Sequence, residues 1–294
     1  MRRSLKYIAF AGTSIFSCAL MYKTYGDPKF GTLHAAANRT NAEVLRSGPA
    51  YPIQEWDTNW DFREPKYWTK PGSPDVPSLK EHFGEVCEEK ASSHKPSATR
   101  HLVFIRHGQY VKGQEDKDRI LTHCGKQQAE ETAKRLKLLH SNNKKIDKIV
   151  ISTMTRAKET GEFIRKALPD VPYEYCEFLR EGAPCTPEPP YNCRTIPKEH
   201  RVFQESARIE AAFRKYFYRA DPEQNTDSIE VYVCHANVIR YFVCRALQFP
   251  SEGWLRMRTN NCGITWLTIR PNGRVQLRSM GDTGHLPPNL ITHD

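Results

Sequence analysis

Apolar and polar positions alternate regularly along the chain from about residue 100 onward. Four short apolar runs have the length of buried strands: 101–106, 148–152, 173–179 and 229–234. Four other segments repeat apolar residues at helical spacing: 125–140, 155–168, 203–220 and 238–247. Two more strands, 263–269 and 274–280, are separated by Pro271-Asn272-Gly273, which is a hairpin turn signal. This alternation predicts an α/β fold with a mostly parallel central sheet and helices on both faces.

Residues 1–25 form a separate segment at the N-terminus. Residues 7–22 carry no charge, basic residues stand on both sides of them, and the first acidic residue is Asp27. As a helix this run reaches roughly 24 Å, which is less than the roughly 30 Å of a bilayer core. The segment fits a tight single membrane span, a secretory signal peptide or a mitochondrial address. We favour a membrane anchor or a mitochondrial targeting segment.

Residues 26–100 show little periodicity and are predicted to form a linker. The linker contains the motif WDTNWD, whose candidate contact residues are Trp56, Asp57, Asn59, Trp60 and Asp61. Two tryptophan side chains are costly to leave in water. They either fold back onto the domain that follows or dock into a neighbouring chain, because aromatic anchors concentrate at interfaces.

Charge and cysteine content narrow the function classes only slightly. The chain has 44 Lys and Arg against 34 Asp and Glu, and its net charge of +10 favours anionic partners such as phosphate groups. The basic residues are dispersed without interleaved aromatic residues, so no nucleic-acid partner is expected. The nine cysteines include no C-x-x-C pair, which gives a zinc site no support and favours free thiols.

Candidate catalytic residues stand where the predicted strands end. Arg106 and His107 end the first strand, Arg156 opens the helix after the second, and Glu181 and His235 follow the third and fourth. Ligand sites in open α/β sheets lie beyond the carboxyl ends of the strands, so these side chains are expected to meet. Phosphoryl transfer needs this set of groups: a nucleophile, guanidinium groups for the phosphoryl oxygens, and an acid for the leaving oxygen.

These motifs resemble a known family. The segments LVFIRHGQY, LTHCGKQQAEETAKRL, ISTMTRAKET, LREG and VCHANVIR are similar to those of the histidine phosphatase superfamily, which has the phosphoglycerate mutase-like fold. The similarity is greater still to the mitochondrial serine/threonine-protein phosphatases of the phosphoglycerate mutase family, with WDTNWD and EGWLRM among the further matches. The resemblance covers nearly all of residues 101–294. It implies that this region is the catalytic domain, with three layers.

The resemblance also implies a role for each candidate residue. His107 is the nucleophile and forms a phosphohistidine intermediate. Arg106 and Arg156 hold the phosphoryl oxygens, and His235 completes the pocket as a cationic donor. Glu181 protonates the departing seryl or threonyl oxygen and then deprotonates the attacking water. No metal and no cofactor are expected.

The function implied by the resemblance is a metal-independent protein phosphatase. Its partners are phosphorylated protein substrates, attacked at phosphoserine and phosphothreonine, with phosphohistidine as a further substrate. The chain is expected to form a homo-oligomer through WDTNWD, to be anchored in a mitochondrial membrane (outer or inner is left open), and to act in mitochondrial quality control and stress or cell-death signalling. The alternatives are a small-molecule phosphatase or phosphoglycerate mutase, and a membrane-tethered oligomeric scaffold.

Two features separate the chain from the mutase branch of the family. That branch typically continues RHG with Glu-Ser and an early asparagine, whereas Gln109, Tyr110 and Val111 follow here, which argues against mutase activity. The segment 182–201, which follows Glu181, is rich in proline. It forms either a stiff surface loop or a rim that selects the substrate around the acid.

Overall fold

The computed structural model describes residues 55–63, 96–142, 144–190 and 198–293. The expected N-terminal anchor (1–25) and most of the expected linker (26–100) lie outside these residues. Within the described part of the chain, no helix is both long enough and apolar enough to cross a membrane.

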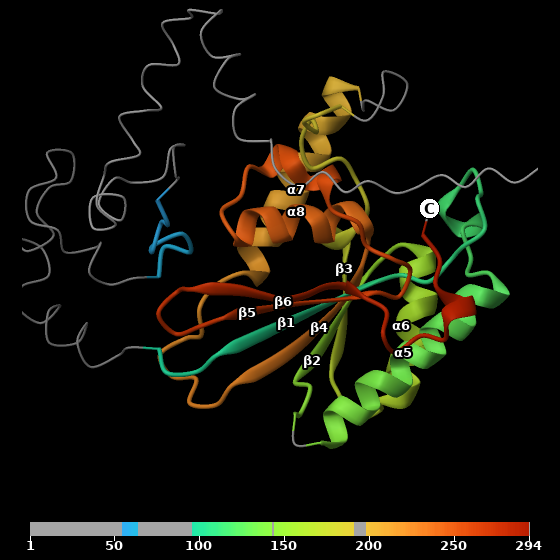
Figure 1. Cartoon of the computed structure of the whole chain (residues 1–294), viewed down its shortest axis with the longest axis horizontal. Helices are drawn as coiled ribbons and strands as arrows, with labels where there is room; N and C mark the ends of the chain where they lie inside the picture. Colours follow the sequence, from blue (N-terminus) through green and yellow to red (C-terminus); the bar gives the residue numbers. More distant parts are fainter. Residues whose placement is uncertain (1–54, 64–95, 143, 191–197, 294) are drawn as a thin grey trace, which may run out of the picture. The chain divides into compact units, whose positions relative to one another are not determined.

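The core of the molecule is a six-stranded sheet with the order β3-β2-β4-β1-β5-β6 (Figure 1). The strands are β1 (Arg100–Arg106), β2 (Lys148–Ser152), β3 (Tyr173–Cys176), β4 (Ser228–Cys234), β5 (Ile264–Ile269) and β6 (Val275–Asp282). The first four are parallel to one another, whereas β5 runs antiparallel to β1 and β6 antiparallel to β5. The predicted mostly parallel sheet is confirmed, and the hairpin turn lies where Pro271-Asn272-Gly273 predicted it.

Helices cover both faces of this sheet, as Figure 1 shows. They are α5 (His123–Ser141), α6 (Thr155–Ala167), α7 (Glu199–Tyr216) and α8 (Ala236–Ala246). Alternate residues of each strand serve different layers, because side chains point to opposite faces with a period of two. Leu102 and Phe104 pack with α7 and α8, whereas Val103 and Ile105 pack with α5 and α6. The predicted three-layer α/β fold is therefore confirmed.

Two elements differ from the sequence prediction by three residues or more at a boundary. The strand predicted over 173–179 ends at Cys176, because Glu177–Leu179 form a single 3-10 turn. The helix predicted over 203–220 spans Glu199–Tyr216 instead, and the backbone of Phe217 is extended. Phe217 is nevertheless buried in the core, so the apolar pattern continues after the helix has ended.

The WDTNWD motif lies on the chain's own domain. The Asp61 carboxylate accepts hydrogen bonds from the backbone N–H of Arg219 at 2.8 Å and from its guanidinium at 2.8–3.1 Å. The indole N–H of Trp60 donates to the carbonyl of Gly273 at 2.8 Å, and its ring packs against Phe213. The structure thus has the motif folded back, which is one of the two arrangements expected from the sequence.

A buried ion pair lies where β1 and β4 begin. The Arg100 guanidinium, 1% exposed, is 2.7 Å from Glu230, which also receives the Tyr232 hydroxyl at 2.6 Å and the Lys148 ammonium at 3.0 Å. Burial alone would raise the pKa of Glu230, but Arg100, Lys148 and the Tyr232 hydroxyl together lower it. The Glu230 carboxylate is therefore charged and fully engaged.

Candidate active site

His107 stands directly after β1, where a tight backbone turn begins. Its N–H donates to the carbonyl of Cys234 at 3.0 Å, which joins it to the end of β4. A Cβ on Gly108 would come within 2.6 Å of the carbonyl oxygen of Gly125, and one on Gly125 within 1.9 Å of the carbonyl oxygen of Gln109. Both positions require glycine because backbone meets backbone there. This close packing fixes the orientation of the His107 side chain against α5.

The hydrogen bonds of His107 assign its reactive nitrogen. Nδ1 lies 2.8 Å from the carbonyl oxygen of Gly108, which can only accept, so Nδ1 carries the proton and Nε2 keeps its lone pair. Burial first, and then the charges of Arg156 and Arg106, hold the pKa of His107 well below its usual value of 6.5. The imidazole is therefore neutral at physiological pH, with Nε2 available as a nucleophile.

Two arginines border that nitrogen. Arg156, 3% exposed, lies at the N-terminus of α6 and donates from Nε to His107 Nε2 at 3.0 Å. Its Nη1 is buried and makes no hydrogen bond to any described residue. Arg106, 6% exposed, donates from Nη1 to the carbonyl of Thr259 at 2.8 Å, which holds it beside the pocket. Arginine suits an oxyanion because its planar fork can bind two oxygens at once.

His235 contributes a further donor, but as a neutral group. Burial first, and then His107, Arg156 and Arg106, hold the pKa of His235 well below 6.5. The Ser152 hydroxyl oxygen accepts the N–H of Met154 at 3.4 Å and lies 2.8 Å from His235 Nε2. We assign the Ser152 hydroxyl as the donor of this hydrogen bond and Nε2 as its acceptor. The ring proton of His235 is then on Nδ1, a buried nitrogen that makes no hydrogen bond to a described residue. The direction of this shift favours a neutral His235 over the expected cationic donor.

Glu181 brings a carboxyl group to the same pocket. The backbone N–H of Gly182 donates to its Oε1 at 3.1 Å and that of Asn237 to its Oε2 at 3.4 Å. Burial raises the pKa of Glu181, against the opposing effects of these N–H groups and of Arg156 and Arg106. A raised pKa helps a carboxylic acid to keep its proton and to deliver it to a leaving group.

The structure brings all five expected residues, Arg106, His107, Arg156, Glu181 and His235, to one edge of the sheet. Among the further residues that touch them, Tyr110, Asp116, Ser152 and Asn237 were not expected as site residues from the sequence. Ser152 and Asn237 stand within the quoted segments ISTMTRAKET and VCHANVIR, so their position beside a strand end was a usable signal. Tyr110 likewise ends the quoted segment LVFIRHGQY, whereas Asp116 lies in a loop that carries no such signal.

Chemically, this edge of the sheet is a cradle for a tetrahedral oxyanion. Two buried nitrogens that make no hydrogen bond to a described residue, Arg156 Nη1 and His235 Nδ1, lie around a neutral imidazole nitrogen and a carboxyl group. Buried polar groups are almost always hydrogen-bonded, so such donors indicate a ligand. In the described ranges, no three His, Cys, Asp or Glu side chains are placed to hold a metal ion. The six cysteines described there are free thiols.

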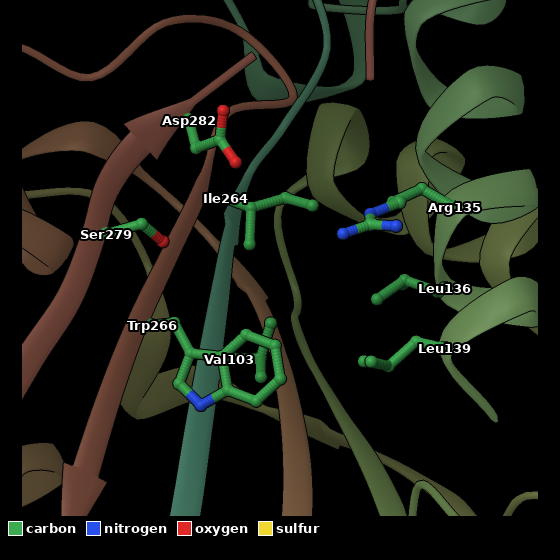
Figure 2. Close-up of a pocket in the computed structure, with 8 residues that line it drawn as sticks. All are labelled: Val103, Arg135, Leu136, Leu139, Ile264, Trp266, Ser279 and Asp282. Atoms are coloured by element: carbon green, nitrogen blue, oxygen red, sulfur yellow. The ribbon is translucent and has the colours of Figure 1, made fainter. Parts of the chain in front are cut away.

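A separate small pocket lies between α5 and the strands β1, β5 and β6 (Figure 2). Figure 2 shows Arg135 and Asp282 reaching toward Ile264 from opposite sides of it. It is lined by Val103, Arg135, Leu136, Leu139, Ile264, Trp266, Ser279 and Asp282. None of the five catalytic candidates belongs to this lining.

Comparison with protein families matches two stretches of the chain. Residues 102–186 and 187–283 match the model of the histidine phosphatase superfamily (branch 1). These stretches cover the sheet except for the first two residues of β1, and they include all five candidate residues of the catalytic edge.

Individual proteins are similar over longer stretches. A Rattus norvegicus protein named mitochondrial serine/threonine-protein phosphatase PGAM5 is 46% identical over 99% of this chain and 98% of its own. The Homo sapiens protein of that name is 50% identical over 84% of this chain and 82% of its own. Among solved structures, a phosphoglycerate mutase from Plasmodium falciparum is 37% identical, with a TM-score of 0.47, over 65% of this chain and 96% of its own.

Proposed function

The chain belongs to the histidine phosphatase superfamily, and we propose that it is a metal-independent serine/threonine-protein phosphatase that works through a phosphohistidine on His107. One observation carries the mechanism: His107 is neutral, with Nδ1–H bound to the Gly108 carbonyl and Nε2 facing the donors of the pocket. The relatives in rat and human carry the same activity in their names. Guanidinium groups supply the positive charge that a metal would otherwise supply.

The first half-reaction transfers the phosphoryl group to the enzyme. His107 Nε2 attacks phosphorus with its lone pair, and the bond from phosphorus to the seryl or threonyl oxygen breaks. Glu181, whose pKa is raised by burial, gives its proton to that leaving oxygen. Arg106, Arg156 and His235 bind the oxygens of the transferring group.

The second half-reaction restores the enzyme. The Glu181 carboxylate accepts a proton from water, and the water oxygen attacks phosphorus as the bond to His107 Nε2 breaks. Inorganic phosphate leaves, His107 returns to its neutral form, and Glu181 again holds a proton. The enzyme is then in its initial protonation state, and one water has been consumed.

The segment after Glu181 is proposed to select protein substrates. Its described part is held against the 3-10 helix η5 (Ser251–Arg256) by two hydrogen bonds. The Trp254 indole N–H donates to the carbonyl of Cys185 at 3.1 Å, and the backbone N–H of Glu188 donates to the carbonyl of Glu252 at 2.9 Å. A rim fixed beside the acid suits a phosphorylated protein side chain that reaches in from outside. A small-molecule phosphatase or mutase is the rival within the same chemistry.

Phosphate release in a chelating buffer tests this function. The full 294-residue chain, in detergent, is given a phosphothreonine peptide, a phosphohistidine peptide and phosphoglycerate in parallel. The proposal expects release from the phosphothreonine peptide that disappears in His107→Ala. Turnover confined to phosphoglycerate would move the chain to the mutase branch. Absence of turnover with every substrate would favour the scaffold alternative.

WDTNWD is proposed to assemble copies of the chain by making the same contacts with a neighbour. Support comes from the burial of these contacts. The Asp61 side chain has no exposed surface, and the Arg219 side chain that it contacts is 5% exposed. Trp60→Ala should lower the mass of the assembly in light scattering and lower turnover. If Trp60→Ala changed neither mass nor turnover, assembly through this motif would be refuted.

The relatives named above are mitochondrial proteins, and a mitochondrial location is proposed for this chain. Residues 1–25 are proposed as its membrane anchor, on their uncharged run and basic flanks. Fusing residues 1–30 to a fluorescent protein tests this directly. Membrane-bound mitochondrial fluorescence is expected, and a diffuse signal would contradict the proposal.

A further inference from the structure

The loop 110–121, called the capping loop below, closes on itself beside the active site. Tyr110 and Leu121 form an antiparallel bridge at its two ends. The N–H of Leu121 donates to the carboxylate of Glu159 on α6 at 2.6 Å. The loop is therefore fastened to the helix that begins with the catalytic arginine.

Asp116, at the tip of the capping loop, holds the N-terminus of α6. Its Oδ2 accepts the backbone N–H of Thr155 at 3.0 Å and the Thr155 hydroxyl at 3.1 Å. The residue that precedes the helix, Met154, offers no side-chain cap. Asp116 thus satisfies an N–H that the first turn of a helix leaves without a partner, and it does so from 39 residues away.

The same carboxylate faces the catalytic arginine. Asp116 Oδ1 lies 3.6 Å from Arg156 Nη1, and neither atom makes a hydrogen bond within the described chain. On another side, the Arg156 guanidinium lies over the Tyr110 ring, 4.7 Å from its centre. One loop therefore contacts the guanidinium twice, once through a negative charge and once through an aromatic face.

Arg156 has to change partners during the reaction. Its Nε now donates to His107 Nε2, which is the lone pair that attacks phosphorus. When a phosphoryl group arrives, this hydrogen bond has to pass to a phosphoryl oxygen. A guanidinium held only at Nε would be released at that moment, whereas one also held at its Nη1 edge keeps its plane and position.

We infer that Asp116 is a positioning residue for phosphoryl transfer: its carboxylate holds Arg156 at Nη1 while Nε passes from His107 to the phosphoryl oxygens. The inference rests on the proposed function of this site. Nothing in it requires Asp116 to touch the substrate. Its effect should appear in kcat more than in KM, because Arg106 and His235 still bind the phosphoryl group in the ground state.

Asp116→Asn separates the charge from the cap. The asparagine oxygen still accepts both Thr155 donors, while the negative charge opposite Arg156 is lost. We expect kcat on a phosphothreonine peptide to fall about tenfold, with KM changed less than about threefold. Asp118→Asn is the matched control, because Asp118 is an exposed carboxylate on the same 3-10 turn (Asp116–Asp118) and should leave both constants unchanged.

A double-mutant cycle identifies the route of the effect. Kinetics are measured on the full chain for the wild type, Asp116→Asn, Arg156→Lys and the double variant, with melting temperatures for each. If Asp116 acts through Arg156, Asp116→Asn adds less than about twofold to the loss already caused by Arg156→Lys. Thr155→Val, which removes the hydroxyl contact and leaves the charge, should keep kcat within about twofold of wild type.

Two results would overturn the inference. One is a kcat within about twofold of wild type for Asp116→Asn. The other is a full tenfold loss that recurs in the Arg156→Lys background, since this would place the effect elsewhere. Failure of the proposed function looks different, because the wild type itself would then release no phosphate from the peptide.

Discussion

Strand β1 buries an arginine at each end, and the two ends differ in how their polar groups are paired. At the start, Arg100 donates from Nε to the charged carboxylate of Glu230 at 2.8 Å, and its Nη2 forms an ion pair with the same oxygen at 2.7 Å. At the other end, beside Arg106, Arg156 Nη1 has only a 3.6 Å ion pair with Asp116, and His235 Nδ1 makes no hydrogen bond to a described residue. Buried polar groups that are hydrogen-bonded or ion-paired stabilise a fold, whereas buried groups without hydrogen bonds indicate a ligand site. The difference separates a structural site from a functional one on a single strand.

The two ends of β1 also differ in how their surroundings shift the pKa values of the buried groups. At the Arg100 end, opposite charges stabilise each other, and the pKa of Glu230 is lowered despite burial. At the catalytic end, burial and neighbouring arginines depress the pKa of His107, and burial raises the pKa of Glu181. Both pKa shifts favour the uncharged forms of His107 and Glu181, at a cost to stability. Substitutions should therefore separate activity from stability in opposite ways at the two ends.

The largest expected effect is on activity at the catalytic end. His107→Asn removes the nucleophile, so kcat/KM should fall by a factor on the order of 10⁴ or more. The free energy of unfolding should change by only about 1 kcal/mol, because this side chain serves the reaction and not the core. Phosphate release and urea unfolding measure the two quantities. His200→Asn, on the exposed start of α7, is the control and should change neither.

The next largest effect is on stability at the other end. Glu230→Gln leaves the Arg100 guanidinium buried without a counter-charge, which should lower the free energy of unfolding by about 3–5 kcal/mol. Turnover below the melting transition should stay within about threefold of wild type. Urea unfolding of Glu230→Gln, with exposed Glu223→Gln as control, gives the answer.

The pH dependence of that loss follows from the lowered pKa of Glu230. Its stabilisation is present above the unfolded-state value near 4.5 and is lost as the pH falls through the lower folded-state value. The difference between wild type and Glu230→Gln should therefore shrink below pH 4.5. A difference that stayed constant from pH 7 to pH 3 would show that the charge of Glu230 is not what stabilises the fold.

Glu181→Gln should have the opposite sign in stability. A raised folded-state pKa means that its favourable contribution exists below pH 4.5 and disappears as the pH rises through the folded-state value. At pH 7.5 the variant should melt at a higher temperature than wild type, and near pH 4 the two should converge. Turnover should fall about 10²- to 10⁴-fold, because the general acid is lost. A lower melting temperature at pH 7.5 would contradict the contrast between the two ends.

The layers of this fold could be predicted because each strand and helix has a hydrophobic periodicity that can be recognised within its own short segment. The five candidate residues could be predicted for the same reason, since each stands at a strand end. The boundary of α7 could not, because Phe217 is buried after leaving the helix. The contacts of Asp116 with Thr155 and Arg156 join residues 39 and 40 positions apart and leave no periodic pattern in the sequence. The charge of His235 depends on packing around it, which no local pattern encodes.

Ser152→Ala gives the smallest effect and tests that last point. Ser152 ends β2 inside the catalytic edge, yet its hydroxyl is paired, donating to His235 Nε2 and accepting from Met154. Alanine removes the bond that keeps the His235 proton on Nδ1, so the tautomer facing the pocket is no longer fixed. The loss of one such hydrogen bond, about 1–1.5 kcal/mol, corresponds to about a tenfold lower kcat/KM. Ser206→Ala, at a half-buried hydroxyl on α7 that donates to the carbonyl of Phe203, should leave kcat/KM unchanged. Full activity in Ser152→Ala would mean that His235 donates without help, and that pairing at this edge serves only the fold.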